Sequence, residues 1–268
     1  MGMCVSEKLA QWAIVHSFGK KAGTKKFHKE VIAAIERNWI DCNQSIESIT
    51  AEQLFDFARK VEHFCPSRWN LIVTILRSIT PHADALRYRK LRFRDFTPPT
   101  EEQWATLLAE CDRLPRSKAG LIIRLLTLTG LRIEEARVLR WEHVREDRIY
   151  VPAAVTKNGK PRVIPLLPGA DAVLKTLRDA PGRNGRVLPT VHCRKGLQKA
   201  CRAAGLKYLS YHCFRHLFAT RCIESGVDIP TVARWLGHQD GGALLSRMYF
   251  HLLDGHSKLM ALKVKIAV

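Results

Sequence analysis

Long apolar runs, paired cysteines and acidic side chains are scarce in this sequence of 268 residues. No stretch approaches the roughly 18 consecutive apolar residues that a membrane-spanning helix requires, and residues 1–21 lack the basic start and apolar centre of a secretory signal. The 8 cysteines include no Cys-x-x-Cys pair, so we expect reduced thiols in a cytoplasmic protein. We therefore expect neither a membrane protein nor a small secreted domain held by disulfides.

The charge balance indicates a polyanionic partner. The chain has 44 Lys and Arg residues against 25 Asp and Glu residues, which gives a formal net charge of +19. A field of this sign attracts polyanions and repels basic partners. Nucleic acid is the first partner class that the composition suggests, although charge alone also fits a basic protein with no such partner.

Helical periodicity dominates the first third of the chain. Apolar residues recur at helical spacing over residues 5–18, 27–40, 51–64 and 67–79, which predicts four helices. Thr50 and Gln53 have the capping-box spacing at the start of the third helix. The fourth helix carries Arg68 and Arg77 around an apolar centre, a pattern that fits a helix in a DNA groove or an ordinary buried helix with charged ends.

A basic segment separates this part from the rest of the chain. Pro81 ends the fourth helix, and Pro98 and Pro99 close the segment 82–97. Its basic side chains are Arg87, Arg89, Lys90, Arg92 and Arg94. Such a run is often a solvated linker, but a positively charged tether also suits a protein that wraps a phosphate backbone. We predict a helical domain over residues 1–81, a basic linker over 82–97 and a second domain over 98–268.

The second domain is predicted to contain helices and one β-hairpin. Helices are expected over residues 101–114, 119–129, 169–181 and 194–205, and a further helix starts at Arg132 after a turn at Gly130. Residues 148–166 have Val-rich arms on either side of Lys157-Asn158-Gly159-Lys160, and Asn-Gly is a strong turn signal. Lys157 is therefore expected at or near a hairpin tip. The predicted fold class is mainly α with a small antiparallel β-sheet.

Residues 210–226, SYHCFRHLFATRCIESG, concentrate cationic side chains on one helix face. His212, Arg215 and His216 stand three and four residues apart, so their side chains share that face. Clustered cationic groups repel one another unless an anion lies between them. A zinc site is an alternative for two histidines at this spacing, but no His-Glu-x-x-His glutamate accompanies them and the basic charge disfavours a cation. We expect no metal.

Motifs in the second domain occur in a characteristic order. They are GLRIEEARVLRW with Arg132, TKNGKPRVIPL with Lys157, HCFRH with His212 and Arg215, LGH with His238, and MYFH with Tyr249. In order and spacing they resemble the catalytic domain of the tyrosine recombinases, the phage integrase family. The four predicted helices of residues 5–80 resemble the core-binding domain that precedes it in Xer-type and simple phage enzymes. The resemblance implies an all-α core-binding domain and an α+β catalytic domain.

The resemblance implies metal-free and ATP-free cleavage and rejoining of DNA through a 3′-phosphotyrosyl intermediate. Tyr249 is then the nucleophile, and Arg132 and Arg215 bind the non-bridging phosphate oxygens with the two-pronged geometry that lysine lacks. His238 donates a further hydrogen bond to the phosphate, and His212 assists the proton transfer of the tyrosine.

Two further residues have roles that the sequence leaves open. Lys157 is our choice for the general acid on the leaving oxygen, with Lys160 across the turn as the alternative. Glu135, one turn beyond Arg132, resembles the acidic residue that orients this guanidinium in the family, although an ordinary surface carboxylate also fits. The residues expected to contact DNA outside the reacting phosphate are Arg68, Arg77, Arg87, Arg89, Lys90, Arg92, Arg94 and Lys160.

The implied partner is double-stranded DNA with inverted-repeat target sites, bound by a homotetramer in the synapse and by a monomer or dimer otherwise. Accessory DNA-bending proteins, no cofactor and a nucleoid-associated location in the cytoplasm are expected. The tail over residues 252–268 has Leu259, Leu262 and Ile266 at helical spacing, for docking on a neighbouring protomer or packing on its own domain.

Two departures from the family pattern are present. The interval from His238 to Tyr249 is longer than usual and contains Gly241 and Gly242, and little chain precedes residue 5, so no arm-binding domain is expected. The alternative functions are a catalytically silent DNA-binding regulator and a type IB topoisomerase-like enzyme.

Overall fold

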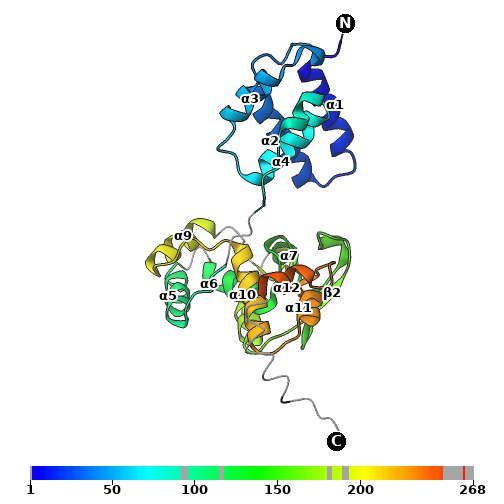
Figure 1. Ribbon diagram of the computed structural model, residues 1–268. Coiled ribbons are helices and arrows are strands. Elements are labelled where there is room, and N and C mark those ends of the chain that lie inside the picture. Colours follow the sequence, from blue (N-terminus) through cyan, green and yellow to red (C-terminus); the bar gives the residue numbers. More distant parts are fainter. Residues whose placement is uncertain are drawn as a thin grey trace, which may run out of the picture. The chain divides into compact units, whose positions relative to one another are not determined.

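The computed structural model describes residues 2–91, 96–114, 118–179, 183–188, 193–249 and 262. The chain forms two compact units, Met1–Arg94 and Asp95–Val268. Figure 1 colours the first unit blue to cyan and the second unit green to red.

The first unit is a bundle of four helices, as predicted. They are α1 (Val5–Ser17), α2 (Ala22–Asn38), α3 (Ala51–Lys60) and α4 (Pro66–Arg77), with short 3-10 turns η1 (Ile46–Ser48) and η2 (Pro81–Ala85). The predicted capping box is present at α3, where the Gln53 backbone N–H donates to Thr50 Oγ1 at 3.3 Å and the Thr50 N–H donates to Gln53 Oε1 at 3.0 Å. Leu9, Ile35 and Phe57 are fully or almost fully buried in the core.

Residues 82–91 pack onto this first bundle, which differs from the linker predicted over 82–97. Trp69 Nε1 donates to the Arg87 carbonyl at 2.8 Å, and Asn70 Nδ2 donates to the Arg89 carbonyl at 2.9 Å. Leu86 is 4% exposed. The segment is held because an apolar side chain enters the core and the backbone finds side-chain donors. Residues 92–95 lie outside the described residues.

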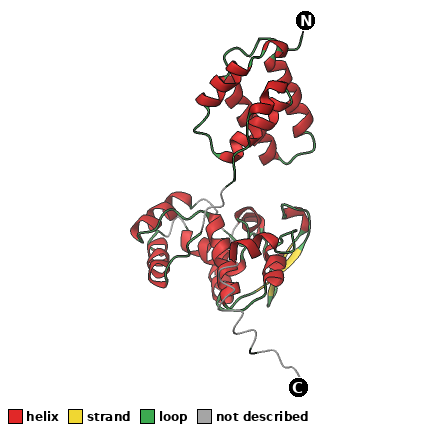
Figure 2. Cartoon of the chain, viewed as in Figure 1, coloured by secondary structure: helices red, strands yellow, loops and turns green. Residues whose placement is uncertain are grey.

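The second unit is mainly helical with a small sheet. Its helices are α5 (Glu101–Asp112), α6 (Ala119–Thr129), α7 (Ile133–Val138), α8 (Ala170–Asp179), α9 (Arg194–Ala203), α10 (Tyr211–Glu224), α11 (Ile229–Leu236) and α12 (Ala243–Tyr249), with 3-10 turns η4 (Trp141–His143), η5 (Ala153–Val155) and η6 (Arg183–Gly185). Strands β1 (Arg148–Val151) and β2 (Arg162–Pro165), yellow in Figure 2, pair antiparallel. Their register places Tyr150 opposite Val163. The predicted fold class is confirmed.

The hairpin is shorter than its predicted span of 148–166. Each strand has 4 residues, and residues 152–161 form a loop that contains η5. Pro152 and Pro161 lack the N–H that a ladder needs, so the strands end beside them. Lys157 therefore lies on a long loop and not on a tight turn between extended arms.

Helix α6 packs against α10 in the centre of the second unit (Figure 1). Gly130 ends α6 with a φ of +61°, a left-handed conformation that L side chains rarely adopt. A Cβ at this position would lie 2.6 Å from Phe218 Cδ1 and 2.7 Å from Leu236 Cδ2. The absence of a side chain at residue 130 thus lets the corner between α6 and α7 rest directly on α10 and α11.

Gly130→Ala is expected to lower the free energy of unfolding of the second unit by about 3 kcal/mol, because it adds both backbone strain and overpacking. Gly159→Ala is the matched control: its φ is +71°, but nothing lies within 4 Å of its added Cβ. It should cost about 1 kcal/mol, from strain alone. Urea denaturation of both variants measures the difference, and equal costs would contradict the packing account.

Candidate active site

Arg215 on α10 is the centre of the candidate site. Arg215 is 3% exposed, so its side chain lies inside the fold. Nη1 donates to the Gly130 carbonyl at 2.7 Å, and Nη2 donates to the Leu236 carbonyl. One guanidinium therefore joins the corner that precedes Arg132 to the end of α11 that precedes His238.

Arg132 is the N-cap residue of α7 and is fixed by Glu135 in the first turn. The Arg132 backbone N–H donates to Glu135 Oε2 at 2.8 Å, and Nη1 donates to Oε1 at 3.0 Å. Glu135 is 2% exposed, which excludes the alternative of an ordinary surface carboxylate. Burial raises the pKa of the Glu135 carboxyl, but the hydrogen bonds and charges of Arg162 and Arg132 outweigh burial and hold this pKa below its usual range.

Arg162 on β2 is a buried member of the site that was not predicted from the sequence. Its Nη1 and Nη2 atoms donate to the two carboxylate oxygens of Glu135 at 3.0 and 2.7 Å. Its Nε donates to the Trp235 carbonyl at 2.8 Å. The alternation along β2 could have indicated it, because Arg162 and Ile164 share the buried face of the strand and Val163 lies on the other face. An arginine on the buried face of a strand requires an acidic partner.

The two histidines of α10 lie together, as their spacing predicts. The rings of His212 and His216 are 4.7 Å apart, centroid to centroid, in an edge-to-face arrangement. The His216 ring also lies near the Phe96 ring, at 5.7 Å between centroids. His216 is therefore in contact with two other rings, those of His212 and Phe96, which favours a supporting role for it.

His238 follows α11, whose C-cap residue Gly237 has a left-handed conformation (φ +68°). The pKa of His238 is lowered to about 4, first by burial and then by the charges of Arg215, Arg132 and His212, while the charge of Asp240 opposes this shift. Its Nδ1 atom is buried and has no hydrogen-bond partner among the described residues. A buried ring nitrogen of this kind is costly unless another group supplies the bond.

The same positive field acts on His212. Shielding from solvent lowers its pKa, and the charges of Arg215 and Arg132 lower it further. Burial lowers the pKa of His216 to about 4, with contributions from His212, Arg215 and His238. Arg132, His212, Arg215 and His238 thus come from three separate parts of the chain and lie within reach of one another's charges. We name these four residues the cationic cluster.

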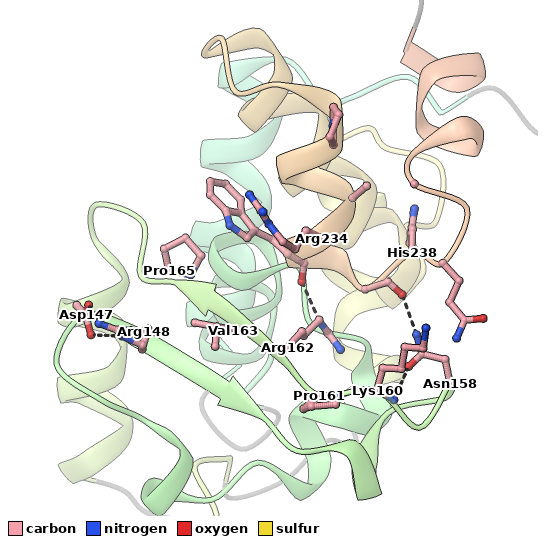
Figure 3. Close-up of a pocket in the computed structure, with 16 residues that line it drawn as sticks. Asp147, Arg148, Asn158, Lys160, Pro161, Arg162, Val163, Pro165, Arg234 and His238 are labelled. Carbon is pink, nitrogen blue, oxygen red and sulfur yellow. Dashed lines mark hydrogen bonds and ion pairs between the residues drawn. The ribbon is translucent and has the colours of Figure 1, made fainter.

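The loop with both candidate lysines approaches this cluster. Asn158 Nδ2 donates to the Gly237 carbonyl at 3.3 Å, and the Lys160 N–H donates to Asn158 Oδ1 at 3.3 Å. The side chains of Lys157 and Lys160 are exposed. A cavity of about 920 Å³ between the hairpin and α11 is lined by Lys160, Arg162 and His238, among others (Figure 3).

Tyr249 is the last residue of α12, a helix that packs against α11. The backbone of Tyr249 is described, but its side chain lies outside what the structure describes. The segment between His238 and Tyr249, which is longer than usual in the family, passes close to α11 at Gly242. A Cβ at Gly242 would lie 2.9 Å from Ile229 Cγ2 on that helix. The tail helix predicted over residues 252–268 falls, except for residue 262, outside the described residues.

Three of the arginines expected to bind DNA are in contact with aromatic rings of the first unit. The guanidinium carbon atoms of Arg68, Arg77 and Arg89 lie 5.2, 4.8 and 4.5 Å from the ring centroids of Phe64, Tyr88 and Trp69. Arg77 and Arg89 also donate to backbone carbonyls. The contacts of Arg77 and Arg89 hold residues 82–91 against the first bundle. Arg87 and Lys90 are exposed, and Arg92 and Arg94 lie outside the described residues.

No helix of the described ranges is long and apolar enough to cross a membrane. Among these same residues, no group of three or more His, Cys, Asp or Glu side chains is placed to hold a metal ion. An anion is the ligand that a cluster with two arginine guanidiniums suits.

Comparison with known proteins gives the same class as the fold and the site. A family model described as the phage integrase family matches residues 99–256. The chain is 33% identical over 137 residues to tyrosine recombinase XerC of Rickettsia typhi, covering 46% of this chain and 44% of the relative. It is 27% identical over 232 residues to prophage integrase IntZ of Escherichia coli K12, and the match covers 77% of this chain and 57% of that relative. The chain spans about half the length of the curated relatives it matches.

Solved structures share the architecture at low sequence identity. A lambda integrase (75–356) dimer bound to a COC′ core site has a TM-score of 0.73 at 20% identity, with 89% of this chain and 96% of that chain covered. The Tn1549 transposon integrase in complex with transposon right end DNA has a TM-score of 0.71 at 17% identity. That match covers 97% of this chain and 100% of the Tn1549 chain. The fold is thus that of the integrase class. With a family model that matches more than half of it, the chain belongs to the phage integrase family.

Proposed function

We propose that this protein is a site-specific DNA recombinase that cleaves and rejoins DNA strands through a 3′-phosphotyrosyl intermediate, without metal or ATP. The observation that carries the proposal is the Arg215 guanidinium, which ties the segments of Arg132 and His238 together in the interior. A fixed arrangement of buried cationic donors stabilises the charge that develops on a phosphate in a transition state.

In this mechanism the guanidiniums of Arg132 and Arg215 bind the non-bridging oxygens of one backbone phosphate. The Tyr249 oxygen attacks phosphorus and forms the new P–O bond, His212 receives the phenol proton, and the bond from phosphorus to the 5′ oxygen breaks. A lysine ammonium, from Lys157 or Lys160, protonates the leaving oxygen. Rejoining reverses each step, so the bond energy is conserved and no nucleotide cofactor is consumed.

The proposed partner is duplex DNA with inverted-repeat sites, bound in a homotetrameric synapse with accessory DNA-bending proteins, and in a nucleoid-associated setting in the cytoplasm. The net charge of +19 supports a polyanionic partner. Among the structurally similar proteins, lambda integrase is seen as a tetramer bound to a Holliday junction. The first unit, 1–94, is proposed to bind the DNA next to the cleavage site.

A nicked duplex that loses a short fragment on cleavage tests the proposal, because the enzyme cannot religate it and the adduct accumulates. Nicked duplexes that carry candidate inverted-repeat sites are incubated with protein and resolved on denaturing gels. We expect a covalent adduct that a chelator does not reduce. Binding that weakens steeply with salt but yields no adduct would instead favour the DNA-binding regulator.

DNA binding is expected to take up protons. Free His238 is neutral at pH 7 because its pKa is about 4. A bound phosphate favours the imidazolium and raises this pKa, so between the free and bound pKa values the affinity increases as the pH falls. Calorimetric titration in two buffers of different ionisation enthalpy should show net proton uptake, reduced in His238→Gln. Proton release on binding would contradict this account.

A further inference from the structure

Arg162 makes contacts in two directions, each toward a residue of the cationic cluster. Toward α7, it pairs with Glu135, and the same two carboxylate oxygens accept bonds from the Arg132 guanidinium and backbone. Toward α11, its Nε donates to the Trp235 carbonyl at 2.8 Å. The Arg162 side chain is 6% exposed, so water does not compete for these bonds.

The stem of Arg162 also supports the backbone that carries His238. A Cβ on Gly237 would lie 2.9 Å from Arg162 Cδ, and the φ of Gly237 is +68°. The chain therefore passes close over the arginine immediately before the histidine. Figure 3 shows Arg162 reaching from the hairpin toward α11, with His238 on the segment that follows.

Only an arginine can make this set of contacts. The planar guanidinium presents Nη1, Nη2 and Nε in one fixed fork, which here meets two carboxylate oxygens and one carbonyl. A lysine has a single nitrogen, so it cannot hold Glu135 with two bonds and the Trp235 carbonyl in the same geometry. The contacts of Arg162 thus use its shape as well as its charge.

We propose that Arg162 is a positioning residue that holds the Arg132 guanidinium and the His238 imidazole at a fixed separation before DNA binds. It acts through Glu135 on one side and through the Trp235–Gly237 backbone on the other, and does not itself touch the phosphate. This inference rests on the proposed strand-cleavage function for its catalytic consequence. Its structural consequence, a displaced His238, is measured without DNA.

Two variants of the full chain test it. Arg162→Lys keeps the charge and loses the fork. The double variant Arg162→Met with Glu135→Gln removes both charges and leaves no buried carboxylate without a partner, so we expect it to fold even if Arg162→Lys does not. Arg148→Lys is the matched control, because Arg148 lies on the neighbouring strand, is exposed and pairs only with Asp147 among the described residues, at 2.7 Å.

The first measurement is the pKa of each histidine in the free protein, followed by NMR of ¹³C-labelled histidine, with His238 assigned from His238→Gln. We expect both Arg162 variants to raise the pKa of His238 from about 4 toward its ordinary value, because the detached segment becomes solvated. His28, which bonds to Ser17 Oγ at 2.9 Å in the first unit, is the internal reference. Arg148→Lys should leave both pKa values unchanged.

The second measurement is the rate of adduct formation on the nicked duplex. We expect about a 10²-fold lower rate with DNA affinity within about threefold, because misplaced groups affect the reaction more than binding. An unchanged His238 pKa, or a rate close to that of the unmodified protein, in a folded variant would overturn the positioning role. If the unmodified protein forms no adduct, the proposed function fails and the histidine titration alone decides the role of Arg162.

Discussion

Replacing Tyr249 with phenylalanine is expected to abolish the covalent DNA adduct and leave DNA affinity unchanged. The substitution removes one oxygen from the end of α12, and this oxygen is the proposed nucleophile. The phosphate contacts proposed for the cationic cluster do not involve it. Adduct yield on the nicked duplex, measured beside equilibrium binding to the intact duplex, separates the two effects.

The matched control for this prediction is Tyr150→Phe. Tyr150 lies on β1, is 44% exposed and faces away from the buried side of the hairpin. It should form the adduct at the rate of the unmodified protein. Persistent adduct in Tyr249→Phe would move the nucleophile to another residue, and loss of DNA binding would show that Tyr249 supports the fold.

Arg215→Gln is the prediction with the second largest effect, and it changes both stability and activity. The Gly130 and Leu236 carbonyls lose their charged donor, and an uncompensated buried acceptor typically costs 1–3 kcal/mol, so the free energy of unfolding should fall by about 2–4 kcal/mol. The rate of adduct formation should fall by about 10³-fold, as for the loss of a transition-state donor. Urea denaturation and single-turnover cleavage measure the two effects.

Arg221→Gln on the same helix is the control for Arg215. Arg221 is exposed and pairs with Glu101 and Glu224 on the surface, and such pairs contribute little. Stability and cleavage should both stay close to those of the unmodified protein. An Arg215→Gln variant that is destabilised but cleaves at the normal rate would reduce Arg215 to a structural residue.

Sequence patterns were most informative where local chemistry determines the structure. The capping box predicted at Thr50 is present, because a cap depends on residues three positions apart. The structure has caps of the same spacing at Thr100 and Asp228. The shared face of His212 and His216 follows from helical periodicity alone. These features needed no knowledge of the tertiary fold.

Contacts between distant segments were not predictable in the same way. The bonds from Arg162 to Glu135 and to the Trp235 carbonyl join residues that only the fold brings together, so no local pattern contains them. The arginines of residues 82–91 illustrate the same limit. Charge and aromatic spacing suggested a solvated tether, whereas Arg89 packs over Trp69 and donates to the Phe64 carbonyl at 2.9 Å.

The central claim is that one backbone phosphate is bound by the cationic cluster and attacked by Tyr249. Digestion of the trapped adduct and mass spectrometry of the DNA-linked peptide test it most directly. The account predicts a single linkage, from the 3′-phosphate of the cleaved strand to Tyr249, and a free 5′ hydroxyl on the released fragment. A linkage to another side chain, or to a 5′ phosphate, would contradict it.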